Sequence, residues 1–342
     1  MGIVGEMTPA LEPGPAVGAT IDRYRLDGVL GHGAMGVVYS AHDPALDRAV
    51  AVKVLHATAS TPARLEAEAK ALARLAHPNV VRVYDVGDYD GRTFVAMELV
   101  VGTTLRQWLR QAHPLDQVLA VIAQAGLGLA AAHRAGLVHR DFKPDNVLIA
   151  DDGRVLVGDF GLARDVGPWP MEAPVSAVAD GAAVGLTTTG TAVGTPAYMA
   201  PEQMLGSATP ASDQFAYCVT AWEALFGARP FAGDTVAALL DNARAGRIVR
   251  PDQRGVPRAI ELALRRGLAP TPAARFAAMP DLLRALAAPR RARRRPWALL
   301  AAVVAASVAV VALTRRPGAA VTSTCARSGA ACSGRMRRPR ST

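Results

Sequence analysis

Residues 139–146 read His139-Arg140-Asp141-Phe142-Lys143-Pro144-Asp145-Asn146, and Asp159-Phe160-Gly161 follows thirteen residues after Asn146. These two segments hold the groups that metal-assisted phosphoryl transfer requires. Asp141 can accept a proton from an attacking hydroxyl, and Asn146 and Asp159 offer hard oxygen ligands for Mg²⁺. The spacing of five residues from Asp141 to Asn146 places both on one tight loop, so both can face one nucleotide.

A glycine-rich segment lies upstream and reads Gly31-His32-Gly33-Ala34-Met35-Gly36-Val37-Val38. Glycine lets the backbone approach a phosphate closely. A dinucleotide fold would need a helix directly after this loop, but Val37-Val38-Tyr39 continues as a strand. The pattern therefore favours a hairpin folded over a nucleotide. The loop alone leaves open the plainer interpretation of a glycine-rich hairpin without a ligand.

Lys53 closes the alternating strand Val50-Ala51-Val52-Lys53 that follows this loop. A lysine at this place can reach the α and β phosphates of a nucleotide, and it needs a carboxylate to hold it. Glu68 on the next predicted helix is the expected partner, and Glu66 is the local alternative. Taken by itself, Lys53 could equally be a solvated lysine on an edge strand.

The pattern along the chain of 342 residues predicts two lobes. Short strand-like runs separated by Gly and Asp turns fill residues 20–101, and one helix is expected over residues 63–75. Residues 102–288 are mostly helical in pattern. Residues 1–19, rich in Gly, Pro and Ala, are expected to be disordered. We therefore expect an α+β fold with a small β-rich lobe and a larger helical lobe.

The net charge of +9 is a property of the C-terminal end. Residues 290–342 contain 12 arginines and no acidic residue, whereas residues 1–289 contain more acidic than basic residues. This distribution argues against nucleic acid as a partner.

The C-terminal end has the pattern of a membrane anchor. A basic juxtamembrane segment over 289–296 precedes the uncharged run 297–313, predicted to be a single transmembrane helix, and a short basic tail over 314–342 is expected to be disordered. As a helix, the uncharged run would be about 26 Å long, near the lower limit for crossing a bilayer. A buried terminal helix is the alternative. Cys325 and Cys332 in the tail could pair in an oxidising compartment.

The set of motifs resembles the bacterial, membrane-anchored, PknB-like serine/threonine protein kinases of the eukaryotic (Hanks) type. The resemblance covers about residues 20–288 and rests on blocks in the family's order, which read GHGAMGVVY (31–39), AVAVKVL (49–55), LAHPNVVRVYDVG (75–87), MELVVGTTL (97–105), HRDFKPDNVL (139–148), GDFGLA (158–163), GTPAYMAPEQ (194–203) and SDQFAYCVTAWEAL (212–225). It implies an ATP-dependent kinase that phosphorylates serine or threonine of proteins. Lys143 and Thr195 are the residues that favour these acceptors over tyrosine.

The resemblance implies a role for each matching residue. Asp141, Lys143, Lys53 and Glu68 would be catalytic, with Glu68 chosen over Glu66 by its spacing from His77. Asn146 and Asp159 would hold Mg²⁺, with Mn²⁺ as a substitute. ATP would contact Leu30, Gly31, Gly33, Gly36, Val38, Ala51, Lys53, Met97, Glu98, Val100 and Leu148. Glu202 should pair with Arg275, and Asp213 should hold the catalytic loop, residues 139–146. A hydrophobic stack between the lobes should contain Leu72, Val83, His139 and Phe160.

The segment before Gly194 offers a switch. Arg140, next to the base, would be costly to bury without a partner, and a phosphate on this segment would supply one. The candidate acceptors are Thr187, Thr188, Thr189 and Thr191, of which Thr189 and then Thr187 are preferred. We expect phosphorylation in trans within a homodimer. A Thr-rich loop without this role is the alternative.

Three functions fit these motifs to different degrees. An active kinase, anchored in the inner membrane with its ATP-binding domain in the cytoplasm, fits best. A pseudokinase scaffold is the alternative, against which the intact Lys53, Asp141, Asn146 and Asp159 argue. A small-molecule phosphotransferase of the same fold would not need the segments 194–196 and 200–202, which shape a peptide platform in protein kinases.

Overall fold

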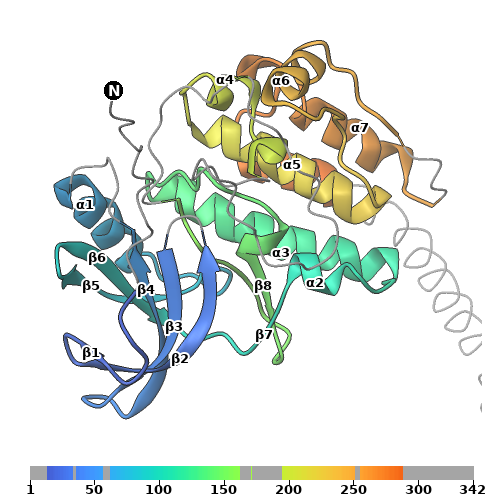
Figure 1. The fold of residues 1–342 in the computed structure, drawn as a ribbon. Coiled ribbons are helices and arrows are strands. Elements are labelled where there is room, and N and C mark those ends of the chain that lie inside the picture. The colour runs from blue at the N-terminus through green and yellow to red at the C-terminus, as the bar shows by residue number, and fades with distance from the viewer. Residues whose placement is uncertain are drawn as a thin grey trace, which may run out of the picture. The chain divides into compact units, whose positions relative to one another are not determined.

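The computed structural model of the protein describes residues 14–33, 36–56, 62–161, 171, 195–250 and 255–287, which form a β-rich lobe followed by a helical lobe (Figure 1). This architecture confirms the two lobes and the α+β fold that the sequence predicts. The predicted juxtamembrane segment, the predicted transmembrane helix and the basic tail lie outside the described residues.

The small lobe is built on an antiparallel six-stranded sheet with the order β1-β2-β3-β4-β6-β5. Its strands are β1 (Thr20–Ile21), β2 (Tyr24–Gly33), β3 (Gly36–Asp43), β4 (Arg48–Leu55), β5 (Val83–Tyr89) and β6 (Arg92–Glu98). Side chains alternate across the sheet, so Val37 and Tyr39 are buried in one hydrophobic cluster while Val38 points to the opposite face. Helix α1 (Pro62–Ala73) packs against β5 and β6.

The glycine-rich segment forms the expected hairpin, because β2 pairs with β3 and Gly33 lies opposite Gly36. Gly36 has a φ of 155°, and a Cβ there would lie 2.1 Å from the carbonyl oxygen of Val54. Only glycine therefore allows β3 to approach β4 at this point. A strand continues from the loop, as predicted, and the dinucleotide arrangement is excluded.

The large lobe is helical around the long helices α3 (Leu115–Arg134) and α5 (Pro210–Phe226). Around them lie α2 (Leu105–Trp108), α4 (Pro201–Met204), α6 (Val236–Arg244), α7 (Arg258–Gly267), and the short 3₁₀ turns η1 (Pro144–Asn146), η2 (Thr195–Tyr198) and η3 (Pro272–Ala274). A second sheet, in the order β7-β8-β9, consists of β7 (Gly102–Thr104), β8 (Val147–Ala150) and β9 (Val155–Val157). One large hydrophobic cluster runs through this lobe and reaches Leu72, Val83 and Val95 of the small lobe.

The sequence encodes the ends of α5 directly. Thr209 and Ser212 form a reciprocal capping box at its start, with Pro210 at the first helical position. Gly227 ends the helix in the left-handed conformation with a φ of 72°. These caps fix the position of α5, which carries Asp213 to the catalytic loop.

Helix α3 is the one described helix that is long and apolar enough to cross a membrane. Its most apolar window is 61% buried inside the large lobe. Its apolar character is therefore explained by its place in the core.

Candidate active site

A buried carboxylate fixes the loop that contains residues 139–146. Asp213 is 1% exposed and accepts hydrogen bonds from the backbone N–H groups of His139 at 2.7 Å and Arg140 at 2.9 Å. The ring of His133 bonds the same carboxylate at 2.8 Å. Because α5 positions Asp213, the core of the large lobe determines where the catalytic loop lies. This confirms the role expected for Asp213.

The loop presents Asp141 in a defined orientation. One carboxylate oxygen of Asp141 accepts from Lys143 Nζ at 2.9 Å and from Asn146 Nδ2 at 3.2 Å. Asn146 Nδ2 also donates to the Asp141 carbonyl at 2.7 Å. The side chain of Asp141 is only 4% exposed, so few water molecules compete for it. The structure therefore brings together three of the predicted site residues on one loop.

Both motifs contain a non-glycine residue with positive φ. Arg140 has a φ of 66° and Asp159 has a φ of 54°. Such backbone is uncommon outside glycine and costs roughly 1–3 kcal/mol, and it persists where surrounding contacts overdetermine it. At Arg140 the contact is the bond from its N–H to Asp213.

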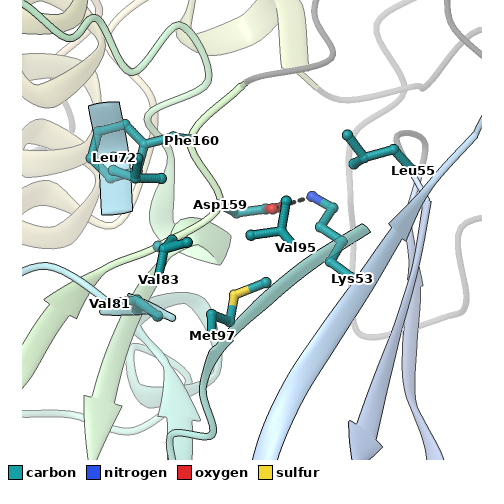
Figure 2. Close-up of a pocket in the computed structure, with 10 residues that line it drawn as sticks. Lys53, Leu55, Leu72, Val81, Val83, Val95, Met97, Asp159 and Phe160 are labelled. Atoms are coloured by element: carbon teal, nitrogen blue, oxygen red, sulfur yellow. Dashed lines mark hydrogen bonds and ion pairs between the residues drawn. The ribbon is translucent and has the colours of Figure 1, made fainter. Parts of the chain in front are cut away.

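The ion pairs between the lobes differ from the prediction. Lys53 contacts Asp159 (Figure 2) and does not pair with Glu68. Glu68 instead forms a two-bond pair with Arg140, at 2.7 Å and 2.9 Å. The expected Lys53–Glu68 pair is therefore absent from this conformation, and Arg140, for which a phosphate was the expected partner, is paired with a carboxylate. The physical reason is geometric, since the place of α1 brings Glu68 within reach of the catalytic-loop arginine.

A pocket lies where Lys53 meets Asp159 (Figure 2). Lys53 and Asp159 form their ion pair in its wall, and Leu72 and Phe160 lie at one end. Its lining consists of Lys53, Leu55, Leu72, Val81, Val83, Val95, Met97, Gly158, Asp159 and Phe160. The pocket thus has mostly apolar walls and one charged pair, the composition typical of a small-molecule site.

The predicted adenine residues Val38, Ala51, Met97 and Leu148 lie on β3, β4, β6 and β8. The sheet register places Val38 opposite Lys53, and Ala51 opposite Met97. Met97, Val100 and Leu148 pack against one small buried cluster.

Two other predicted ATP contacts, Leu30 and the backbone of Glu98, have different surroundings. Leu30 is 54% exposed. The backbone N–H of Glu98 already donates to the Arg82 carbonyl at 2.8 Å. The hydrogen bonds to the base that are expected of the backbone at 98–100 would therefore use groups other than this N–H.

The predicted hydrophobic stack is buried between the lobes. Leu72, Val83, His139 and Phe160 are all at most 6% exposed, and the rings of His139 and Phe160 lie 4.5 Å apart. Burial lowers the pKa of His139 below 6.5, although nearby carboxylates oppose this. The neutral ring bonds the Gly158 carbonyl at 2.9 Å, and so ties the catalytic loop to the Asp159 segment.

The predicted pair of Glu202 and Arg275 is also present. Arg275 has no exposed side-chain surface and donates to both Glu202 oxygens, at 2.6 Å and 2.9 Å. It also donates to the carbonyls of Ala211, Ala269 and Pro270. The guanidinium therefore has a full set of acceptors in a buried position.

One polar cluster next to the catalytic loop could not be predicted from the sequence. Arg106 donates from Nε to Asp145 at 2.8 Å, from Nη2 to the Tyr198 hydroxyl at 2.6 Å, and from Nη1 to Glu223 at 3.3 Å. Tyr198 donates in turn to Glu223 at 2.5 Å. Burial, with the Glu223 charge, raises the pKa of Tyr198 above its usual value, so the phenol stays protonated. Asp145 lies in the quoted motif, but its partners are far away in sequence and carry no local signal.

The described residues fit a Mg²⁺ ion of the kind that shares its coordination with phosphates. Among them, no group of three His, Cys, Asp or Glu side chains could hold a metal alone. Asn146 uses its Nδ2 toward Asp141, which leaves Oδ1 as its ligand atom. Asp159 is 43% exposed. Mg²⁺ is commonly held by one or two such oxygens together with substrate phosphates.

The four threonines proposed for the switch, at 187, 188, 189 and 191, lie outside the described residues, as does the segment 172–194.

The comparisons with known proteins agree with this geometry. Residues 24–280 match the protein kinase domain family. The chain is 38% identical to the serine/threonine-protein kinase PknD of Mycobacterium tuberculosis over 280 residues, which cover 78% of this chain and 40% of PknD. It is 42% identical to PknA of the same organism over 233 residues, covering 64% of this chain and 51% of PknA. The alignments thus span about half or less of these relatives.

The fold comparison gives the same result. The crystal structure of the PknI kinase domain of M. tuberculosis superposes with a TM-score of 0.59 at 29% identity, covering 80% of this chain and 98% of that one. The family match spans most of the chain and includes both lobes and the catalytic loop. The chain therefore belongs to the protein kinase family.

Proposed function

We propose that the protein transfers the γ-phosphoryl group of ATP to serine and threonine hydroxyls of proteins, as a bacterial signalling kinase. The observation that carries this proposal is the buried Asp141, held by Lys143 and Asn146 on a loop that Asp213 fixes from the core. Phosphoryl transfer asks a protein mainly for positioning and charge neutralisation, and this arrangement supplies both.

The glycine-rich hairpin supports ATP as the donor. A Cβ at Gly31 would meet nothing within 4 Å, and one at Gly33 only the Gly36 carbonyl oxygen at 3.6 Å. The packing of the protein itself therefore does not require these two glycines. Close approach of a triphosphate does, because a side chain would hold the phosphates away from the backbone.

Each catalytic side chain has a task in the transfer. Asp141 orients the acceptor hydroxyl and takes its proton as the oxygen–phosphorus bond forms and the bond to the β-phosphate oxygen breaks, so that ADP leaves. Lys143, at 2.9 Å from Asp141, offsets the charge on the transferring group. Lys53 binds the phosphates from the small-lobe side. Asn146 and Asp159 would hold Mg²⁺, which supplies charge neutralisation at the phosphate oxygens.

A rearrangement of ion pairs would accompany activation. Arg140 is paired with Glu68 here, and a phosphate on the segment before Gly194 would compete for the same guanidinium. Glu68, once released, could pair with Lys53 as the family pattern implies. We propose Thr189, then Thr187, with Thr188 and Thr191 as the other acceptors, phosphorylated in trans by a second copy. Replacing all four by alanine should lower the activity, and unchanged activity would contradict this switch.

The membrane assignment rests on sequence. The uncharged run 297–313 between arginines would cross the inner membrane once, and the need for ATP places the kinase domain on the cytoplasmic side. The arginines of 290–295 would then lie at the cytoplasmic surface, where anionic lipids attract them.

The full chain in detergent, with γ-labelled ATP, Mg²⁺ and a generic acceptor protein, tests the activity. We expect label on serine and threonine, including those of the chain itself, and a loss of about 10²–10⁴-fold for Asp141→Asn. Asp152→Asn, the same change at an exposed turn residue, is the matched control. Nucleotide binding without transfer would favour the alternative, a membrane-tethered pseudokinase scaffold.

A further inference from the structure

The stretch of sequence that includes helix α7 is strongly basic. Seven arginines and only two acidic residues lie between residues 242 and 267. The side chains of Arg258 and Arg250 are 69% and 45% exposed. Val249, next to Arg250, and Leu262 are half-exposed apolar residues in this region. The region thus combines positive charge with accessible aliphatic groups.

The exposed face of α7 places one leucine among arginines. Helical residues three and four positions apart share a face, so Arg258, Arg265 and Arg266 surround Leu262. Leu262 is 51% exposed, whereas Ile260, Ala263 and Leu264 on the opposite face are buried in the core. We call the surface formed by Arg250, Arg258, Leu262, Arg265 and Arg266 the α7 face.

A buried glutamate holds three of these arginines in place. Glu261 is 1% exposed and bonds Arg265 at 2.9 Å, Arg258 at 3.1 Å and Arg250 at 3.4 Å. One carboxylate thus binds three guanidinium groups but neutralises only one of their charges, so a net charge of +2 remains. The charges are preorganised, so an anionic partner need not order them itself.

We propose that the α7 face docks the kinase domain onto an anionic lipid surface, with the arginines on the headgroups and Leu262 among them. Arginine-rich faces with a few aliphatic residues suit the boundary between headgroups and acyl chains. An acidic protein would also match the charge. We favour a bilayer because the proposed membrane span at 297–313 would hold the domain next to one.

The place of α7 in the chain supports a lipid partner. The helical residues 279–287 close the described part of the chain, and within them Leu282 packs at the C-terminal end of α7, 3.9 Å from the position that a Cβ on Gly267 would occupy. The arginine run 290–295 and the uncharged run 297–313 begin a few residues later. This inference rests on the membrane span proposed above, which would keep the domain at the bilayer.

The full chain in lipid nanodiscs tests the docking. A fluorophore on Ala259→Cys, at the exposed edge of α7, reports its depth through quenching by headgroup-labelled lipid, with Cys325 and Cys332 replaced by serine. Discs of phosphatidylcholine are compared with discs of phosphatidylcholine and phosphatidylglycerol. We expect strong quenching only in the mixed discs, and a decrease as salt screens the charges.

The test variant is Arg258→Gln with Leu262→Gln, which leaves Arg250 and Arg265 on Glu261. Each arginine at such a surface changes the docked-to-free ratio about fivefold, so the double variant should lower the ratio about tenfold or more. The matched control is Arg25→Gln with Leu46→Gln, an exposed pair on the small lobe. It should quench like the parent chain.

Three outcomes would overturn the proposal. Quenching could be equal in the two kinds of disc, or absent from both. It could depend on anionic lipid and yet survive the double variant, which would assign the effect to 290–295.

For a variant that does not fold, the salt series on the parent chain decides, because salt-independent quenching contradicts docking by charge. A chain that fails to enter discs contradicts only the span, and quenching with preformed mixed vesicles then decides the α7 face.

Discussion

The ion pairs inside the large lobe and those between the lobes differ in burial. Within the large lobe, Arg275 is fully buried on Glu202, and Asp213 is 1% exposed beneath the catalytic loop. Between the lobes, the side chains of Glu68 and Asp159 are 22% and 43% exposed. Arg275 and Asp213 have lost their water and depend on their partners, whereas the carboxylates of Glu68 and Asp159 are in contact with water and can exchange partners more easily.

This difference separates a fixed half of the site from an adjustable half. Asp141 and Asn146 lie on the fixed half, because the loop that carries them is bonded to α5. Lys53 and Glu68 come from the small lobe and reach across to Asp159 and Arg140. A site built in this way keeps its base in place while the contacts on the nucleotide side rearrange.

The largest effect is expected at the fixed half. Arg275→Met keeps much of the volume but removes the guanidinium, and leaves Glu202 and three carbonyls without their donor. We expect the free energy of unfolding to fall by about 3–5 kcal/mol. Urea denaturation followed by tryptophan fluorescence measures it. Arg284→Met, at an exposed arginine paired with Asp281, is the control, and equal losses for both would remove the distinction between the two halves.

A smaller effect is expected from the protonation of His139. Burial lowers its pKa in the folded state below 6.5, so the unfolded chain binds the proton more readily. The stability that neutral His139 contributes is complete above pH 6.5 and is lost as the pH falls below it, by at most about 1.4 kcal/mol per pH unit.

His139→Gln offers the comparison, because its amide can still donate to the Gly158 carbonyl. It should show a weaker pH dependence of unfolding between about pH 7 and pH 5. His56 and His77, whose pKa values burial also lowers, are the same in both proteins and cancel. Identical slopes would show that His139 does not carry the effect.

The smallest change in stability is expected at the adjustable half. Glu68→Gln keeps an amide oxygen that can still accept a hydrogen bond from Arg140, so the guanidinium retains a partner at this position. We expect the free energy of unfolding to fall by about 1 kcal/mol, the net value of one hydrogen bond. Phosphoryl transfer should still fall, by as much as about 10²-fold, because Lys53 loses the partner that the active arrangement needs. Glu98→Gln, which breaks an exposed pair with Arg154, is the control for stability. A loss of several kcal/mol in the Glu68 variant would place this pair in the fixed half.

Much of the site could be read from the sequence because its residues lie close together in the chain. The loop 139–146 brings Asp141, Lys143 and Asn146 together by local geometry alone. The caps of α5 at Thr209 and Gly227 are equally local. The cluster around Arg106 could not be read in this way, because Arg106 and Glu223 are 117 residues apart.

The amino-acid sequence by itself determined the chemical groups of the site, the hairpin of the glycine-rich loop and the two-lobe architecture, since each depends on short-range pattern. The tertiary structure alone decided the ion pairs between the lobes, and so joined Glu68 to Arg140 and Lys53 to Asp159. Opposite charges attract wherever they meet. Which of them meet depends on how α1 packs against the sheet, and sequence spacing does not specify this packing.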